Sequence, residues 1–106
     1  MTARMKKAGI VQAVRREAVA AREQAVAGRE RAAALREVAK ARNLAAADDE
    51  QRAPTLRREA RFALREARLH ETTARVYDAE ARRADAQADA EEAIARRKSF
   101  GRQAKK

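Results

Sequence analysis

Small apolar residues, most of them alanine, recur every three or four positions along most of this chain. An average spacing near 3.5 residues is typical of helices that pack side by side in coiled coils. Two stretches carry the pattern, at about residues 3–47 and 54–99. Between them, residues 48–53 carry mostly acidic and polar side chains and lead into the only proline. The pattern predicts two long helices joined by a turn at residues 48–53 and followed by a basic tail at residues 100–106.

Helix-breaking residues are few, and each has an expected place. Pro54 suits the first position of a helix, because its missing N–H would have no helical acceptor there. The three acids at residues 48–50 can interact favourably with the N-terminal dipole of the second helix. Gly101 is expected to end that helix. Gly9 and Gly28 lie inside the first helix and are expected to mark points where the two helices approach closely.

A seven-residue repeat of arginine–glutamate pairs sets the register of both helices. Folding the chain at residue 51 places residues opposite each other when their numbers add to 102. Large residues then face small ones, as Tyr77 faces Ala25. The inward positions are Val11, Val14, Ala18, Ala21, Ala25, Gly28, Ala32, Leu35, Ala39 and Arg42 in the first helix, and Ala60, Ala63, Ala67, His70, Ala74, Tyr77, Ala81, Ala84, Ala88 and Glu91 in the second.

Charges beside this seam indicate the same fold. Arginines flank it on the first helix and acids flank it on the second, at the positions called e in the heptad. An exposed pair contributes only about 0 to 1 kcal/mol, so such pairs favour one alignment over parallel or slipped ones rather than adding much stability. The expected pairs are Arg15–Asp85, Arg22–Asp78 and Arg29–Glu71. The expected fold class is all-α: one domain, residues 1–106, forming an antiparallel coiled-coil hairpin with an Ala-rich seam.

Composition limits what such a hairpin can do alone. Of 48 hydrophobic residues 30 are alanine, which buries little apolar area, so we expect the seam to need support from a partner. With one serine, no cysteine and one histidine, the chain offers no nucleophile beside a base and no metal cluster. We therefore expect no enzyme activity and no cofactor. His70 is expected to pack in the seam, and the acids at residues 48–50 to form a solvated turn rather than a cation site.

The net charge of +10 gathers at the two ends of the sequence. Residues 1–16 carry five basic groups, residues 96–106 carry six, and neither segment contains an acid. A hairpin brings both segments to one end, so this end is expected to bind a polyanion such as RNA, DNA or an acidic protein surface. Solubility is the alternative reason for basic termini. The excess of arginine over lysine suits phosphate contacts, although arginine and alanine also follow from a GC-rich genome.

A second expected surface is the outer face of the second helix, where Phe62, Leu69 and Val76 recur at seven beside arginines. Apolar residues that form a stripe usually contact a partner, whereas singly exposed ones are ordinary. We expect Phe62, Leu69 and Val76 to contact a protein. The expected nucleic-acid or polyanion contacts are Arg4, Lys6, Lys7, Arg15, Arg16, Arg61, Arg68, Arg75, Arg82, Arg83, Arg96, Arg97, Lys98, Arg102, Lys105 and Lys106.

Together these features predict a non-enzymatic structural or adaptor subunit of a larger assembly, bound to nucleic acid in a nucleoprotein particle such as a ribonucleoprotein. The alternative is a protein-only component: part of a phage particle, part of a cytoskeletal assembly, or a homo-oligomeric helical bundle. The apolar runs are too short to span a bilayer, so we expect a soluble intracellular or particle-bound protein. Residues 1–16 resemble a mitochondrial presequence, but Val11 and Val14 continue the seam, which favours a retained helix end.

Overall fold

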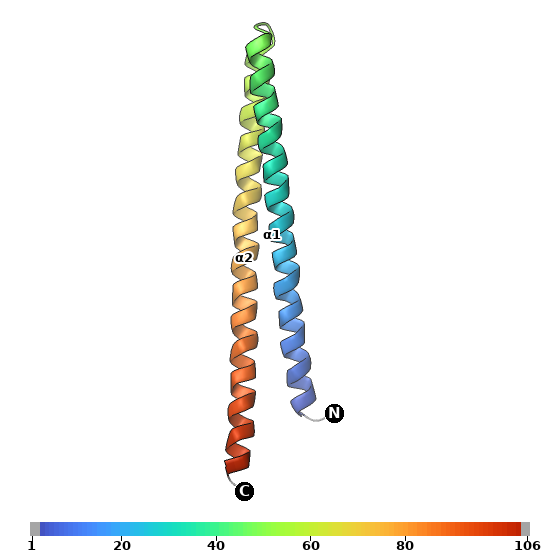
Figure 1. Cartoon of the computed structure of the whole chain (residues 1–106), viewed down its shortest axis with the longest axis vertical. Helices are drawn as coiled ribbons and strands as arrows, with labels where there is room; N and C mark the ends of the chain where they lie inside the picture. The colour runs from blue at the N-terminus through green and yellow to red at the C-terminus, as the bar shows by residue number, and fades with distance from the viewer. Residues whose placement is uncertain (1–2, 105–106) are drawn as a thin grey trace. The chain divides into compact units, whose positions relative to one another are not determined.

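In the computed structural model, the chain forms two α-helices, α1 (Ala3–Asp48) and α2 (Ala53–Ala104). The structure describes residues 3–104, with the side chains of Lys6 and of residues 8–101. The two helices pack against each other in a hairpin, so the predicted all-α fold class is confirmed. Figure 1 shows α1 running into the turn and α2 running back from it beside α1, so the chain directions of the two helices are opposite there. No helix of residues 3–104 has a segment long and apolar enough to cross a membrane.

Contacts divide the hairpin into two units, each of which combines one segment of α1 with one segment of α2. The turn unit is Glu23–Tyr77, and the terminal unit is Met1–Arg22 together with Asp78–Lys106. Both units contain the same heptad of small residues.

The turn is held by one carboxylate and one backbone carbonyl. It runs from residue 49 to residue 52, slightly shorter than predicted. The Arg52 N–H donates to Oδ1 of Asp49 at 3.2 Å. The Leu56 N–H donates to the Arg52 carbonyl oxygen at 2.9 Å, which closes the first turn of α2. Pro54 lies in this first turn, as expected, because a proline there removes a donor that has no intrahelical acceptor.

The seam is built almost entirely from alanine, at the predicted positions. Apart from Val14 and Leu56, every buried hydrophobic residue in the described part of the chain is alanine. Ala39 packs in one cluster with Ala60 and Ala63. A further cluster, formed by Ala46, Ala53 and Leu56, extends the seam one heptad closer to the turn than predicted. Ala39 with Ala63 and Ala46 with Leu56 both fit the predicted sum of 102, so the seam register is confirmed.

The two glycines inside α1 have different surroundings. A Cβ added at Gly28 would lie 3.2 Å from the His70 carbonyl oxygen and 3.3 Å from the Ala74 Cβ, so the predicted close approach is confirmed here. A Cβ at Gly9 would meet nothing within 4 Å, so the same prediction is wrong for Gly9. Neither glycine breaks the helix, because neither has a positive φ.

The predicted end of the second helix is wrong. The helix α2 continues through Gly101 to Ala104, so residues 100–104 are helical rather than part of a tail. A glycine ends a helix when it adopts the left-handed conformation, and Gly101 has no positive φ.

Candidate docking and polyanion-binding surfaces

One flank of the seam carries ion pairs between arginines of α1 and acids of α2. In the turn unit, Arg36 pairs with Glu71. In the terminal unit, Arg22 pairs with Asp85. The Arg36 guanidinium lowers the pKa of Glu71, mainly by its hydrogen bond to the carboxylate. The expected arginine flank and acidic flank therefore do meet, as an antiparallel hairpin requires.

Arg15 holds three acids of α2 at once. Its guanidinium nitrogens lie 3.0 Å from Asp89, 3.0 Å from Glu92 and 3.8 Å from Asp85. The hydrogen bonds that Arg15 donates to Glu92 and Asp89 raise the pKa of its guanidinium. The predicted Arg15–Asp85 pair is thus present, but it is the longest of the three.

The other expected pairs are displaced by one heptad. Arg22 pairs with Asp85, and Glu71 pairs with Arg36, each one heptad away from the partner predicted from sequence. The reason is the direction of helical side chains, which lean toward the N-terminus of their own helix. In an antiparallel pair, an arginine of α1 and an acid farther along α2 therefore lean toward each other. The residue numbers of these two displaced ion pairs add to 107, whereas the residue numbers of side chains that face each other in the seam add to 102.

The side chain of Arg42 does not occupy the inward position predicted for it. Its side chain is 48% exposed, and its Nε lies 3.1 Å from the Glu59 carboxylate. A guanidinium is costly to bury, and its long stem allows the charge to reach solvent and an acid. The prediction that Arg42 is buried in the seam is therefore wrong. His70 is half-buried at the seam, as expected.

The expected polyanion contacts divide between the two units. Arg61, Arg68 and Arg75 are exposed in the turn unit. In the terminal unit, the expected contacts whose side chains are exposed are Lys6, Arg16, Arg82, Arg83, Arg96, Arg97 and Lys98. Lys105, Lys106 and the side chains of Arg4, Lys7 and Arg102 lie outside the described residues. The terminal unit contains 14 basic and 7 acidic residues, against 12 and 9 in the turn unit, so most of the net charge belongs to the terminal unit.

Three apolar side chains form the outer stripe of α2: Phe62, Leu69 and Val76. They are 59%, 63% and 53% exposed, and all three lie in the turn unit. Their seven-residue spacing keeps them on one face of the helix. The sequence correctly predicted that a simple hairpin leaves this face uncovered.

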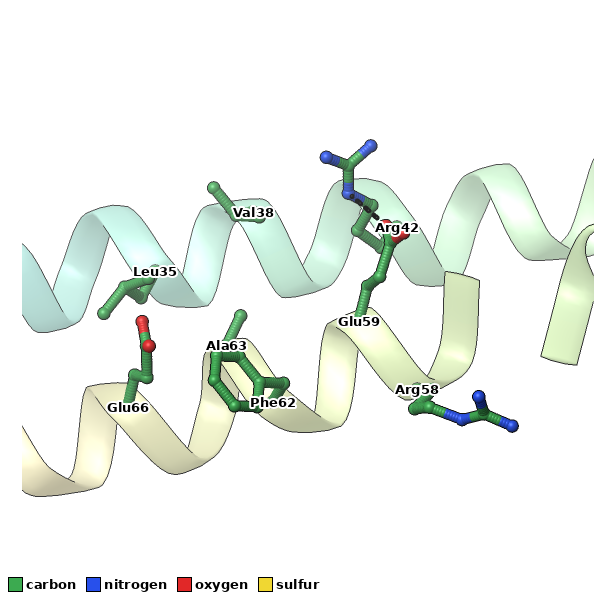
Figure 2. A pocket seen from close by; sticks show the side chains of 8 residues that line it. All are labelled: Leu35, Val38, Arg42, Arg58, Glu59, Phe62, Ala63 and Glu66. Atoms are coloured by element: carbon green, nitrogen blue, oxygen red, sulfur yellow. Dashed lines mark ion pairs between the residues drawn. The ribbon is translucent and has the colours of Figure 1, made fainter. Parts of the chain in front are cut away.

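A shallow groove of about 420 Å³ adjoins the outer stripe at Phe62. Figure 2 shows Leu35 pointing toward α2, the Phe62 ring beside Ala63, and Arg42 reaching Glu59. The lining residues are Leu35, Val38 and Arg42 from α1 and Arg58, Glu59, Phe62, Ala63 and Glu66 from α2. Sequence reasoning missed the contribution of Leu35 and Val38. The signal was present, because Val38 occupies the heptad position that borders this side of α2 in an antiparallel pair.

The described residues include no buried polar or charged residue and no metal-binding cluster. No group of three or more histidines, aspartates and glutamates among them is arranged to hold a metal ion. No described buried side-chain polar atom lacks a hydrogen-bond partner. The features that distinguish this molecule are therefore surfaces: the ion-paired flank, the basic terminal unit, and the outer stripe with its groove.

Comparison of the chain with protein-family models, with curated proteins and with solved structures finds no match. The function is therefore inferred from the chain's own surfaces.

Proposed function

We propose that this chain is a non-enzymatic adaptor subunit of a nucleoprotein assembly, and that its terminal unit binds the phosphate backbone of a nucleic acid. One observation carries the proposal: both acid-free basic segments, residues 1–16 and 96–106, belong to the same unit. Concentrating like charges on one small unit raises the local potential toward phosphates. The described cations Lys6, Arg16, Arg96 and Arg97 are exposed there.

The ion pairs of the terminal unit add to this support. Three of its acids, Asp85, Asp89 and Glu92, are held by Arg15 and Arg22. Those carboxylates are neutralised locally, which reduces their repulsion of a phosphate. Arg15 is correspondingly committed to the hairpin, so we leave it out of the proposed contact. Phe100, which is 77% exposed near Arg97, offers a ring on which an unpaired base could stack.

The test is a matched pair of charge variants. The first replaces Lys6, Arg16, Arg96 and Arg97 with glutamine, and the second replaces Arg31, Lys40, Arg57 and Arg58 of the turn unit. Both lose four charges from exposed positions. Affinity for arbitrary duplex DNA and single-stranded RNA is measured across salt concentrations. The terminal variant should bind more weakly and flatten the salt slope by up to about 0.9 per lost duplex phosphate contact.

The control variant should keep a slope close to that of the native chain. Equal losses in the two variants would contradict a site in the terminal unit. Failure of the native chain to bind either nucleic acid at low salt would contradict the proposed function as a whole. Circular dichroism checks that both variants remain helical.

A second candidate function is supported by a different observation, the exposure of Phe62, Leu69 and Val76 in one row. In this case the chain is a protein-only structural component, such as a phage-particle or cytoskeletal subunit or a self-associating bundle. Alanine at these three positions leaves the charge unchanged but removes the apolar contact, worth about 1.5 to 3 kcal/mol for each fully buried large side chain. Loss of protein docking with intact nucleic-acid binding would favour this candidate.

A further inference from the structure

The outer stripe of α2 has opposite charges on its two sides. At about 100° per residue, Arg58, Arg61 and Arg65 lie on one side of Phe62, and Glu59 and Glu66 lie on the other. Arg68 and Arg75 continue the basic side beside Leu69 and Val76. The groove lies mainly on the acidic side, where Glu59 and Glu66 line it, although Arg58 of the basic side also contributes to its lining.

This division of charge bears on which partner can cover the stripe. A nucleic acid laid along it would bring phosphates against Glu66, which opposes its binding; Glu59 opposes it less, because Arg42 already pairs with it. A helix that carries arginines on one side and acids on the other would match it. The chain itself contains such a helix, the 59–77 segment of α2.

We propose that the outer stripe of α2 is the contact surface for a second copy of this chain, and that the two copies of α2 run parallel. In a parallel pair related by a two-fold axis along the helices, the basic side of each stripe meets the acidic side of the other. An antiparallel pair would bring arginines against arginines and glutamates against glutamates. The charges therefore select both the partner and its direction.

The same arrangement accounts for the groove. The arginines of the second copy lie over Glu59 and Glu66, and its apolar stripe meets Phe62, Leu69 and Val76 of the first. Leu35 and Val38, which line the groove from α1, extend the apolar surface on the acidic side. Self-association deepens the second candidate function and requires no nucleic acid, so its failure would leave phosphate binding by the terminal unit untouched.

The first experiment is sedimentation equilibrium of the full chain, free of nucleic acid, over a wide range of concentration. The native chain is expected to self-associate, and the Phe62→Ala/Leu69→Ala/Val76→Ala variant to stay monomeric. The control is Val26→Ala/Leu44→Ala, which truncates side chains of the same unit that are 53% and 67% exposed. A native chain that stays monomeric at the highest concentration would overturn the proposal, as would equal losses in the two variants.

The second experiment tests whether the two copies of α2 run parallel, by changing charged residues beside the outer stripe. Glu66→Arg and Arg65→Glu should each weaken self-association by about tenfold, because each places like charges together in a parallel pair. The exchange of both, Arg65→Glu/Glu66→Arg, keeps composition and net charge and should restore association. Stronger association of Arg65→Glu alone would show an antiparallel pair and overturn the parallel one. Circular dichroism of each variant verifies that the helices are intact.

The third experiment uses the absence of cysteine from the sequence. In a parallel pair, identical residues of the stripe meet across the two-fold axis. Val76→Cys alone should therefore give a disulfide-linked dimer under mild oxidation, whereas the matched Val26→Cys should not. Crosslinking of Phe62→Cys chains to Val76→Cys chains, in preference to either with itself, would overturn the parallel arrangement.

Discussion

The turn unit and the terminal unit each contain an Ala-rich seam but expose different chemistry. The turn unit presents the outer stripe and its groove. The terminal unit carries the larger excess of basic residues and a single arginine that holds three acids. Small seam residues hold the helices together without using the large apolar side chains, which stay exposed and available. One repeating sequence can therefore support two separate surfaces on the same pair of helices.

The largest expected difference between the units concerns their glycines. Gly28→Leu should lower the free energy of unfolding by about 1 to 3 kcal/mol, because its side chain would press against His70 and Ala74. Gly9→Leu should raise it by roughly 0.5 to 1 kcal/mol, because leucine favours the helix and the site is open. Urea unfolding followed by circular dichroism measures both. Equal effects at the two sites would contradict the close approach at Gly28.

A smaller effect tests the displaced ion pairs on the charged flank. Arg36→Glu and Glu71→Arg should each lower the free energy of unfolding slightly, because this ion pair is exposed, and the two together should restore most of the loss. The control exchange, Arg29→Glu with Glu71→Arg, follows the pairing predicted from sequence and should not restore stability, because Arg36 remains beside the new arginine. Thermal unfolding at low salt resolves the difference. Recovery in the control but not in the Arg36 exchange would favour the sequence-predicted pairing.

The smallest expected effect is a pH dependence from Glu71. Its pKa in the folded chain is lowered by Arg36, so it contributes stability above its ordinary value of 4.5 and loses that contribution as pH falls through the folded value. Glu71→Gln should therefore make stability less sensitive to pH in the acid range. The exposed Glu37→Gln serves as the matched control. In the terminal unit the pKa of Arg15 is raised, so this side chain stays charged throughout and adds no acid-range dependence.

The seam could be predicted from sequence because burial follows directly from heptad position. Ala25, Ala32 and Ala74 are buried as expected, and Gly28 meets Ala74 at the predicted sum. The ion pairs could not be placed by counting alone, because long side chains reach about one turn away from their own Cα atoms. Because the charges repeat every seven residues, an ion pair displaced by one heptad still joins an arginine to an acid.

The candidate surfaces were only partly predictable. The exposure of Phe62 follows from its place outside the seam, and the structure agrees. The groove beside it depends on Leu35 and Val38 from the other helix, so it required the distance between the helices as well as the heptad. Gly101 shows the opposite difficulty: a residue that permits a helix to end does not require it to end there.

The alanine seam has a consequence for the length of the chain. If α1 slid past α2 by seven residues, Leu35 would meet Ala60 or Ala74 in place of Ala67, so this layer would still pair leucine with alanine. The charged flank repeats at the same interval. The Asp49–Arg52 turn and the close approach of Gly28 to Ala74 have no counterpart one heptad away, so these two features fix the alignment. Removing one heptad from each helix together would keep the remaining layers matched, so a hairpin of this design can shorten or lengthen in steps of about 10.5 Å without redesign of its interior.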